Sequence, residues 1–418
     1  MTTQIYGGDE ISAIVLDPGS QYTRAGYAGE DTPKCVIESN YGLLTEENES
    51  KIIIGDNFIY APRSGMEIRN PMSEGIVCDW DIATQIWSYA IRTCLRVDPV
   101  EHPLLVTEPS WNPPKNREKT MEIVFEKFGS PAFYLAKNAV CASFANGKST
   151  ALILDVGAQV ASVTPIYDGL VLKRGVMKQN LAGNYLSAQA RAYFHRANIP
   201  IVPHYMVKKK IPVNAGVPSK AELRTFSNIH NSFHIFQQDR VMQEFKESIC
   251  QVFERSLSES IPSSRPAKAF EFPDGYNLLI DIDRYKIPEV LFNPLFLVTE
   301  SPEIMPPENS VSLAQLLYNS AMACDTDIRA TLLGNIIITG GTSLIQGFGD
   351  RILTELQILA PGSRIKINAS GNTVERKYAS WLGGSILASL GTFHQLWISK
   401  KEYDEEGDHV LLIEKRCK

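Results

Sequence analysis

Apolar and polar residues alternate along the chain in short blocks that predict strands and helices in turn. Residues 11–36 have the pattern strand, turn, strand, turn, and the apolar runs 104–107 and 151–155 predict buried strands. Apolar positions recur with helical spacing over 82–97 and 313–322. Strands that alternate with helices are typical of layered α/β proteins. The pattern therefore predicts an α/β fold.

The same periodicities predict the remaining elements. Helices are expected over 114–128, 139–145, 184–196, 240–253 and 349–359, and strands over 133–135, 159–166, 170–174 and 335–339. Loops are expected over 199–220, 257–275 and 299–310, where proline, lysine or serine is frequent, and an acidic loop followed by a short strand over 43–54. The apolar stretch 381–398 is interrupted by glycine, histidine and glutamine, which favours a buried helix over a membrane span.

One short phrase occurs twice. Residues 14–21 are Ile-Val-Leu-Asp-Pro-Gly-Ser-Gln, and residues 152–159 are Leu-Ile-Leu-Asp-Val-Gly-Ala-Gln. Each copy is an apolar strand that ends in Asp-x-Gly and is followed by small or polar residues and a second strand. The repeat predicts two similar lobes, each of which presents one hairpin to a shared cleft.

Composition and charge exclude several classes of protein. The 418 residues carry a net charge of -6, which argues against wrapping of nucleic acid over the whole surface. The basic run 208–210 is predicted to be a solvated loop.

The seven cysteines lack the spacing of a metal knuckle or redox pair, and the first residues lack a secretory leader pattern, so a reducing compartment, cytosol or nucleus, is expected. His230 and His234 have zinc-compatible spacing, but no third ligand accompanies them.

The duplicated turns suit a polyphosphate. The small residues Gly19, Ser20 and Gly157 allow backbone N–H groups to approach phosphate oxygens. Asp17 and Asp155, at the strand ends, can hold the water shell of a Mg²⁺ ion, which uses few protein carboxylates. A single Asp-x-Gly is usually a plain β-turn, but two copies in matching strand contexts favour phosphate binding.

A third turn follows the strand 335–339. Gly340 and Gly341 would let the backbone lie against a flat ligand such as adenine or ribose. The alternative is a tight connection between a strand and a helix.

Specific phrases resemble the actin family nearly from end to end. The phrases are Arg-Ala-Gly-Tyr-Ala-Gly-Glu-Asp at 24–31, Trp-Asn-Pro-Pro-Lys-Asn-Arg-Glu-Lys at 111–119, Asp-Thr-Asp-Ile-Arg at 325–329, Gly-Gly-Thr at 340–342 and the tail 381–403. Departures from actin at 5–10, 271–277, 286–294 and 373–377 resemble the nuclear actin-related protein 4 branch, which includes the BAF subunits of animals.

The resemblance implies the actin fold, in which two related α/β lobes with smaller inserted subdomains enclose a nucleotide cleft. The implied division is residues 1–38, 71–145 and 379–418 for subdomain 1, 39–70 for subdomain 2, 146–181 and 306–378 for subdomain 3, and 182–305 for subdomain 4.

The resemblance also implies ATP, with or without Mg²⁺, as the ligand. Its nucleotide-binding positions are Asp17, Gly19, Ser20, Arg24, Asp155, Gly157, Lys246, Glu247, Gly340, Gly341, Thr342 and Lys377, and the metal positions are Asp17 and Asp155, through water. Arg24 replaces a lysine of the family, and Gln21 replaces a glycine.

The positions that activate water in actin are altered. Asn138, Ala158 and Ser162 stand where the family has glutamine, aspartate and histidine. A shift of about 1 Å in the attacking water can cost about 10²-fold, and loss of a general base about 10²–10⁴-fold. We therefore expect no catalytic residues and negligible hydrolysis.

The implied role is that of a structural subunit of nuclear chromatin-remodelling or histone acetyltransferase complexes. Phe144, Leu387 and Leu390 match the groove that binds amphipathic helices; ordinary core packing is the alternative. The expected partners are the helicase-SANT-associated (HSA) helix of a remodeller or scaffold subunit and actin or another actin-related protein. Contact with histones or the nucleosome stays open, and no membrane partner is expected. The alternative function is a cytoskeletal actin-like ATPase that polymerises, against which the short acidic segment 40–50 also argues.

Overall fold

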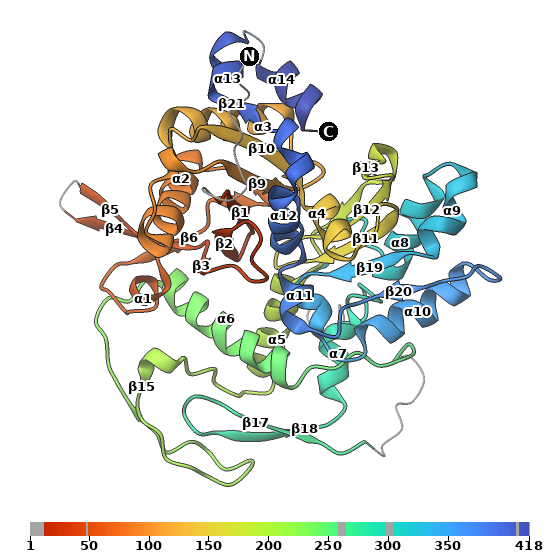
Figure 1. Cartoon of the computed structure of the whole chain (residues 1–418). Coiled ribbons are helices and arrows are strands. Elements are labelled where there is room, and N and C mark those ends of the chain that lie inside the picture. Colours follow the sequence, from red (N-terminus) through yellow and green to blue (C-terminus); the bar gives the residue numbers. More distant parts are fainter. Residues whose placement is uncertain are drawn as a thin grey trace.

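Two β-sheets form the centres of two lobes that lie side by side in the computed structural model (Figure 1). The structure describes residues 12–46, 49–257, 265–297, 302, 304–406 and 409–417. The sequence phrase at 5–10 lies outside these residues, as do parts of the acidic segment 40–50 and of the loops expected over 257–275 and 299–310.

The first lobe contains a six-stranded sheet in the order β21-β10-β9-β1-β2-β3. Its strands are β1 (Ile14–Pro18), β2 (Tyr22–Tyr27), β3 (Cys35–Glu38), β9 (Leu104–Glu108), β10 (Ala132–Lys137) and β21 (Ile398–Ser399). Strand β1 is antiparallel to β2 and parallel to β9.

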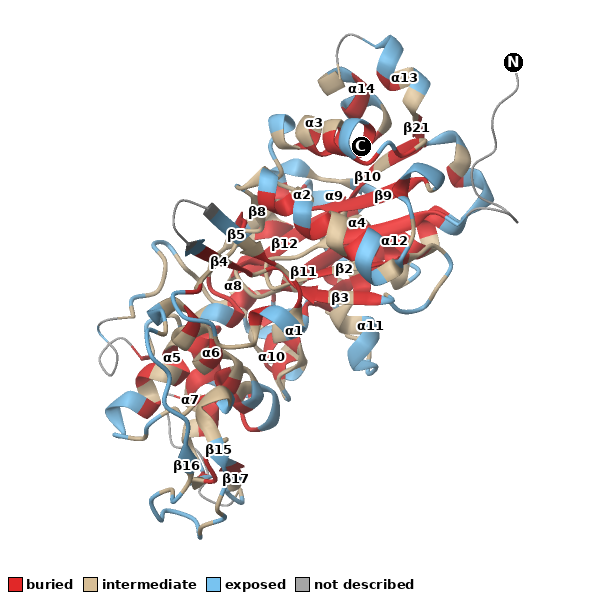
Figure 2. Ribbon diagram, turned by 90° about the vertical axis from the view of Figure 1, so that its left-hand side faces the viewer, coloured by how far each residue is buried: buried red, intermediate tan, exposed pale blue. Residues whose placement is uncertain are grey.

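Alternate side chains of β1 face two different cores. Ile14 and Leu16 pack with α2 (Trp80–Ser88) and its π-helical continuation η1 (Tyr89–Leu95). Val15 packs on the other face with Trp381 of α12 (Ala379–Ser389). Helices therefore cover both faces of this sheet. Figure 2 shows buried residues on the strands and on the adjoining sides of helices.

The second lobe repeats this arrangement. Its main sheet has the order β13-β12-β11-β19-β20, and β14 pairs with β12. The strands are β11 (Ala151–Val156), β12 (Ala161–Tyr167), β13 (Leu170–Val171), β14 (Met177–Gln179), β19 (Ile336–Thr339) and β20 (Ile367–Asn368). Strand β11 is antiparallel to β12 and parallel to β19, as β1 is to β2 and β9.

The second lobe carries seven of the fourteen α-helices of the described residues. They are α5 (Gly183–Arg196), α6 (Asn231–Ser248), α7 (Asp283–Glu289), α8 (Leu313–Met322), α9 (Thr326–Leu333), α10 (Phe348–Leu359) and α11 (Thr373–Lys377). Short hairpins β15–β16 (Val207–Lys209, Glu222–Leu223) and β17–β18 (Lys268–Glu271, Asn277–Ile280) lie beyond them.

A small insert extends from the first lobe. It comprises β4 (Tyr41–Glu46), β5 (Glu49–Ile53), α1 (Asp56–Ile59) and β6 (Glu67–Arg69), with strand order β5-β4-β6. Beside it, β7 (Met72–Ser73) pairs with β8 (Ile76–Val77).

The remaining helices complete the first lobe. They are α3 (Pro114–Glu122), which continues as the π-helix η3 (Ile123–Lys127), α4 (Asn138–Ala145), α13 (Lys400–Glu405) and α14 (His409–Arg416). Helices α4 and α12 cross closely at Gly383. A Cβ at this position would lie 1.7 Å from the carbonyl oxygen of Cys141, so glycine is needed for this approach. The chain passes between the lobes after α4 and again before α12.

The predicted α/β class is confirmed, but several boundaries were wrong. The helix expected over 240–253 spans 231–248, because the His230 side chain caps an earlier start by accepting from the Ser232 amide. The loops expected over 199–220 and 257–275 contain β15 and β17, and the acidic loop after residue 43 is part of a hairpin.

Other elements are shorter than expected. The strand expected over 170–174 is only β13, and the helix in the apolar stretch 381–398 ends at Ser389. Within the described ranges, every helix is too short or too polar to cross a membrane.

Candidate nucleotide-binding site

A cleft of about 600 Å³ lies between the two lobes. All twelve residues that the sequence assigned to nucleotide binding line it, as do Asn138, Ala158 and Ser162. These fifteen residues come from six separate segments of the chain, which the fold brings to one cavity.

The two repeated phrases form matching hairpins. In the first, the amide of Gly19 donates to the carbonyl of Tyr22 over 3.0 Å; in the second, the amide of Gly157 donates to the carbonyl of Val160 over 3.0 Å. Asp17 is the cross-strand partner of Arg24. In the second hairpin the corresponding pair is Asp155 and Ser162, so the positive charge is present on one side only.

Asp17 is held by protein donors. Its carboxylate accepts from the Arg24 guanidinium at 2.7 Å, from the Thr107 hydroxyl at 2.5 Å and from the Ser380 hydroxyl at 3.1 Å. The guanidinium also lies over the ring of Tyr378, 5.2 Å from its centroid. These contacts fix the end of β1 at the cleft. Sequence reasoning missed Thr107 and Ser380.

Asp155 has a different electrostatic environment. Burial, together with the negative charge of Asp17, raises its pKa to about 6, and only Arg24 acts in the opposite direction. A carboxylate of this kind favours a proton or a cation nearby. The two aspartates therefore suit a magnesium ion held through water. Among the described residues no cluster of three or more acidic, histidine or cysteine side chains could bind a metal directly.

The turn after β19 presses against the second hairpin. Gly340 has φ +91°, and a Cβ at this position would lie 2.4 Å from the carbonyl oxygen of Val156, so only glycine fits. The Thr342 hydroxyl donates to the carbonyl of Gly157 at 2.8 Å, and the Gly183 amide at the start of α5 donates to the same carbonyl at 3.1 Å. These contacts fix the shape of the turn.

Basic side chains border the rest of the cavity. The Lys246 ammonium donates to the Gly183 carbonyl and the Ser187 hydroxyl, both at 2.7 Å, and burial lowers its pKa to about 8. The ammonium of Lys377 lies 5.5 Å from the centroid of the Tyr22 ring.

The three altered positions offer little for activating water. The Asn138 carboxamide oxygen accepts from the Ala139 amide at 2.7 Å, within its own helix. Ala158 has no polar side chain, and Ser162 is buried beside Asp155.

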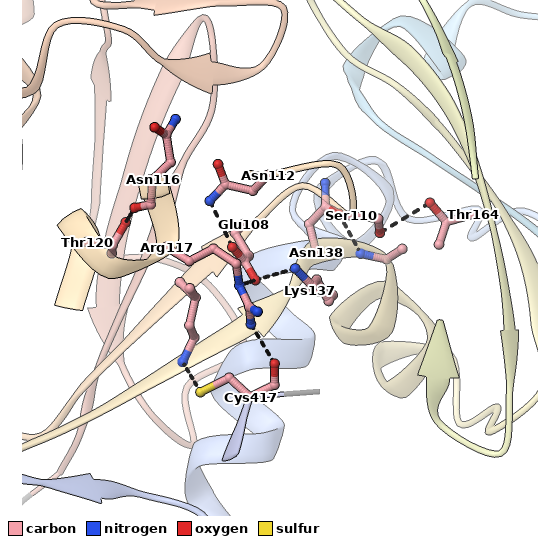
Figure 3. Close-up of polar contacts among 12 residues, drawn as sticks. Glu108, Ser110, Asn112, Asn116, Arg117, Thr120, Lys137, Asn138, Thr164 and Cys417 are labelled. Atoms are coloured by element: carbon pink, nitrogen blue, oxygen red, sulfur yellow. Dashed lines mark hydrogen bonds and ion pairs between the residues drawn. The ribbon is translucent and has the colours of Figure 1, made fainter. Parts of the chain in front are cut away.

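A buried ionic network adjoins the cleft below Asn138 (Figure 3). Glu108, which lines the cavity, accepts from Arg117 at 2.9 Å, from Asn112 at 2.8 Å and from Lys137. Arg117 also donates to the carbonyl of Cys417 at 2.5 Å, so the network links the cleft to the C-terminal helix. Burial lowers the pKa of Lys137, and the carboxylate of Glu108 opposes this effect. The sequence analysis did not identify this network.

The three residues assigned to a partner groove differ in exposure. Phe144, on α4, and Leu390, directly after α12, are 37% and 41% exposed. Leu387 is only 7% exposed and packs in the core of the first lobe. The burial of Leu387 favours the alternative of ordinary core packing, and its place in a partner groove stays a prediction.

Two weaker candidates have ordinary structural roles. His230 caps α6, and the imidazole of His234 forms a hydrogen bond with the Tyr205 hydroxyl at 2.9 Å. In the basic run 208–210, Lys208 pairs with Glu222, and Lys210 with Glu271.

Two lobes with the same strand arrangement and matching hairpins around one cleft define the class of two-lobed α/β proteins. The actin family model matches residues 8–418, and the chain belongs to the actin family.

Individual relatives match over the full length. The chain is 46% identical to actin-related protein 4 of Schizosaccharomyces pombe, with 100% of both chains covered. It is 44% identical to the SWI/SNF and RSC complexes subunit arp42 of the same organism, with coverage of 98% of this chain and 100% of the relative. Actin-related protein 4 of Arabidopsis thaliana is 37% identical, with 99% and 100% covered.

Proposed function

We propose that the chain is an ATP-binding, non-hydrolysing structural subunit of nuclear chromatin-remodelling or histone acetyltransferase complexes. Its similarity to a subunit of the SWI/SNF and RSC complexes supports the assignment to such assemblies. The observation that carries nucleotide binding is the single cavity lined by all twelve expected residues.

In this proposal the two hairpins bind the triphosphate through their backbone amides, and the turn at Gly340 accepts the adenosine. Asp17 and Asp155 would hold magnesium through water, and the ion would supply positive charge against the phosphates. The division into four subdomains expected from the sequence belongs to the same proposal.

Negligible hydrolysis follows from the positions that would orient water. The Asn138 carboxamide already accepts a backbone N–H, and Ala158 supplies no carboxylate. The nucleotide would then serve as an internal brace between the lobes.

The partner surface would be formed by Phe144 and Leu390, which expose apolar side chains at the ends of α4 and α12. We propose that an HSA helix binds there, together with actin or another actin-related protein elsewhere on the same helix.

A purification experiment tests the proposal. The chain is co-expressed with an HSA segment, and the complex is analysed for bound nucleotide and for phosphate release. Co-purification with stoichiometric ATP and no phosphate release is expected. Filaments on addition of magnesium and salt, with phosphate release, would instead establish the polymerising ATPase.

A further inference from the structure

Two cysteines that are far apart in the sequence meet on the first lobe. Cys35 is the first residue of β3 and is buried, with 3% of its surface exposed, whereas Cys94 lies near the end of η1 and is exposed. The two side chains lie within hydrogen-bonding reach of each other. Their spacing in the sequence does not indicate a redox pair, because β3 and η1 come together only in the fold.

Regular structure holds both cysteines in place. Cys35 is the cross-strand partner of Ala25 on β2, and it packs in the core of the first lobe. The element that carries Cys94 is a π-helix, a rare form that is frequent at functional sites. It ends where Arg96 adopts a left-handed conformation with φ +61°, and the neighbouring Leu95 packs against the same core as Cys35. The two thiols are therefore carried by anchored elements.

The surroundings of the pair give the two thiols different roles. Burial, hydrogen bonding with Cys94 and the negative charge of Asp56 raise the pKa of the Cys35 thiol, so it stays protonated and shielded from solvent. The thiolate is the form that reacts with an oxidant. Since Cys94 is the exposed member of the pair, an oxidant in solution meets it first, and Cys35 is placed to react second.

We propose that Cys94 and Cys35 form a dithiol that hydrogen peroxide oxidises reversibly to a disulfide. In the first step the Cys94 sulfur attacks one oxygen of the peroxide and the O–O bond breaks, which gives a sulfenic acid and one water. In the second step the Cys35 sulfur attacks the sulfenic sulfur. The S–S bond forms, the S–O bond breaks, and the hydroxyl leaves with the Cys35 proton as a second water. The two thiols lose two electrons, which reduce the peroxide, and a dithiol reductant reverses the change.

The remaining cysteines supply an internal comparison. Cys78 is also exposed, but its thiol donates to the carbonyl of Ile76 at 3.7 Å. It therefore reports how an exposed cysteine reacts outside the pair. The other four are buried: Cys141, Cys250, Cys324 and Cys417.

Peptide mapping of the full-length chain tests the proposal. The reduced protein is treated with hydrogen peroxide, its remaining thiols are blocked, and it is digested with trypsin without reduction. Trypsin places Cys35, Cys78 and Cys94 in the separate peptides 35–51, 70–92 and 93–96. The link between 35–51 and 93–96 is expected to exceed any link to 70–92 at least about 10-fold, and dithiothreitol should remove it. Equal oxidation of Cys78 and Cys94 without this link would overturn the proposal.

Three single variants separate the two roles. Cys94→Ser changes an exposed side chain and is expected to abolish the link. Cys35→Ser should leave Cys94 as a sulfenic acid, which dimedone traps at least about 5-fold more than in the wild type. Cys78→Ser is the matched control and should keep the link and its reversal. A link that survives in Cys94→Ser, or disappears equally in Cys78→Ser, would overturn the assignment.

The disulfide would also brace the first lobe, because it would close the segment 36–93 into a loop. This segment contains the small insert and α2, and closing a long loop restricts the unfolded chain. Oxidation is expected to raise the melting temperature of the wild type by about 3–6 °C and to leave that of Cys94→Ser unchanged. An unchanged melting temperature in wild type that carries the link would overturn the bracing. The inference does not depend on the proposed nucleotide binding.

Discussion

Replacement of Asp155 by asparagine tests whether the cleft is electrostatically strained without a ligand. Burial and the charge of Asp17 raise the pKa of Asp155 to about 6 from an ordinary value of 3.8. At about 1.36 kcal/mol for each step in pKa, the ionised carboxylate destabilises the nucleotide-free fold by about 3 kcal/mol at neutral pH. Asparagine keeps the shape and removes the charge. We expect Asp155→Asn to raise the free energy of unfolding at pH 7 by about 1–3 kcal/mol.

The pH dependence has a definite sign. Between pH 3.8 and about 6 the native Asp155 binds more protons than the unfolded one, so its contribution to stability falls as pH rises through this window and is constant above it. The asparagine variant lacks this fall. The free energies are measured by urea unfolding of nucleotide-free protein at pH 4 and pH 7, with the five tryptophans as the fluorescent probe.

Asp17→Asn is the matched control, because it changes the corresponding residue of the other hairpin. Asp17 pairs with Arg24 at 2.7 Å, so its loss leaves a guanidinium without its partner and should destabilise the protein by about 1–3 kcal/mol. Lower stability of Asp155→Asn than of the wild type at pH 7, or an identical pH dependence, would show that the ionised Asp155 carboxylate does not destabilise the nucleotide-free fold.

Three further predictions concern chemistry, partner binding and the buried network. The triple variant Asn138→Gln, Ala158→Asp, Ser162→His is expected to release phosphate from bound ATP at least about 10²-fold faster than the wild type, measured in a single-turnover assay. Leu390→Asp is expected to weaken capture of an HSA helix at least about 10-fold in a titration, with an unchanged melting temperature. Glu108→Gln is expected to lower the free energy of unfolding by about 3–5 kcal/mol in urea, because two buried cations lose their carboxylate.

Each of these predictions has its own control. Conversion of Ser162 alone should not restore phosphate release, since groups in one network act together. Ile358→Asp alters a residue that is 74% exposed on α10 and should leave HSA binding intact. Asn112→Ala removes only a neutral donor to Glu108 and should cost about 1 kcal/mol. Each assignment would be contradicted if its test variant and its control variant changed phosphate release, HSA binding or the free energy of unfolding to the same extent.

Much of the fold could be predicted from the duplicated phrase, because the alternation of residues in strands and the residue preferences of turns are local properties of the sequence. The phrase predicted both hairpins, and the structure gives them the same hydrogen bond, from Gly19 to Tyr22 and from Gly157 to Val160. The resemblance to actin then indicated further cleft residues such as Lys246. This lysine is far from both hairpins in the sequence, so local patterns do not predict that it lines the cleft.

Contacts between distant segments could not be predicted in this way. The hydroxyls of Thr107 and Ser380 reach Asp17 from two other elements, and only the sheet register and the position of α12 bring them there. One signal was available for Thr107: it is the last residue of the buried strand expected over 104–107, as Thr339 is the last residue of the strand expected over 335–339. In the structure these strands are β9, parallel to β1, and β19, parallel to β11. The sequence does not decide between a groove and a core for Leu387, because an apolar residue matches both equally well; in the structure this residue is buried.

The asymmetry of the two hairpins is consistent with the proposal that a nucleotide stabilises this protein without being hydrolysed. In the first hairpin Arg24 neutralises Asp17; in the second, Ser162 faces Asp155 and leaves its charge uncompensated. If a nucleotide binds as proposed, its magnesium ion would place positive charge beside Asp155, and binding and folding stability would then be coupled at this residue. Because the Asn138 carboxamide is bound within α4, the same ligand would lie unhydrolysed.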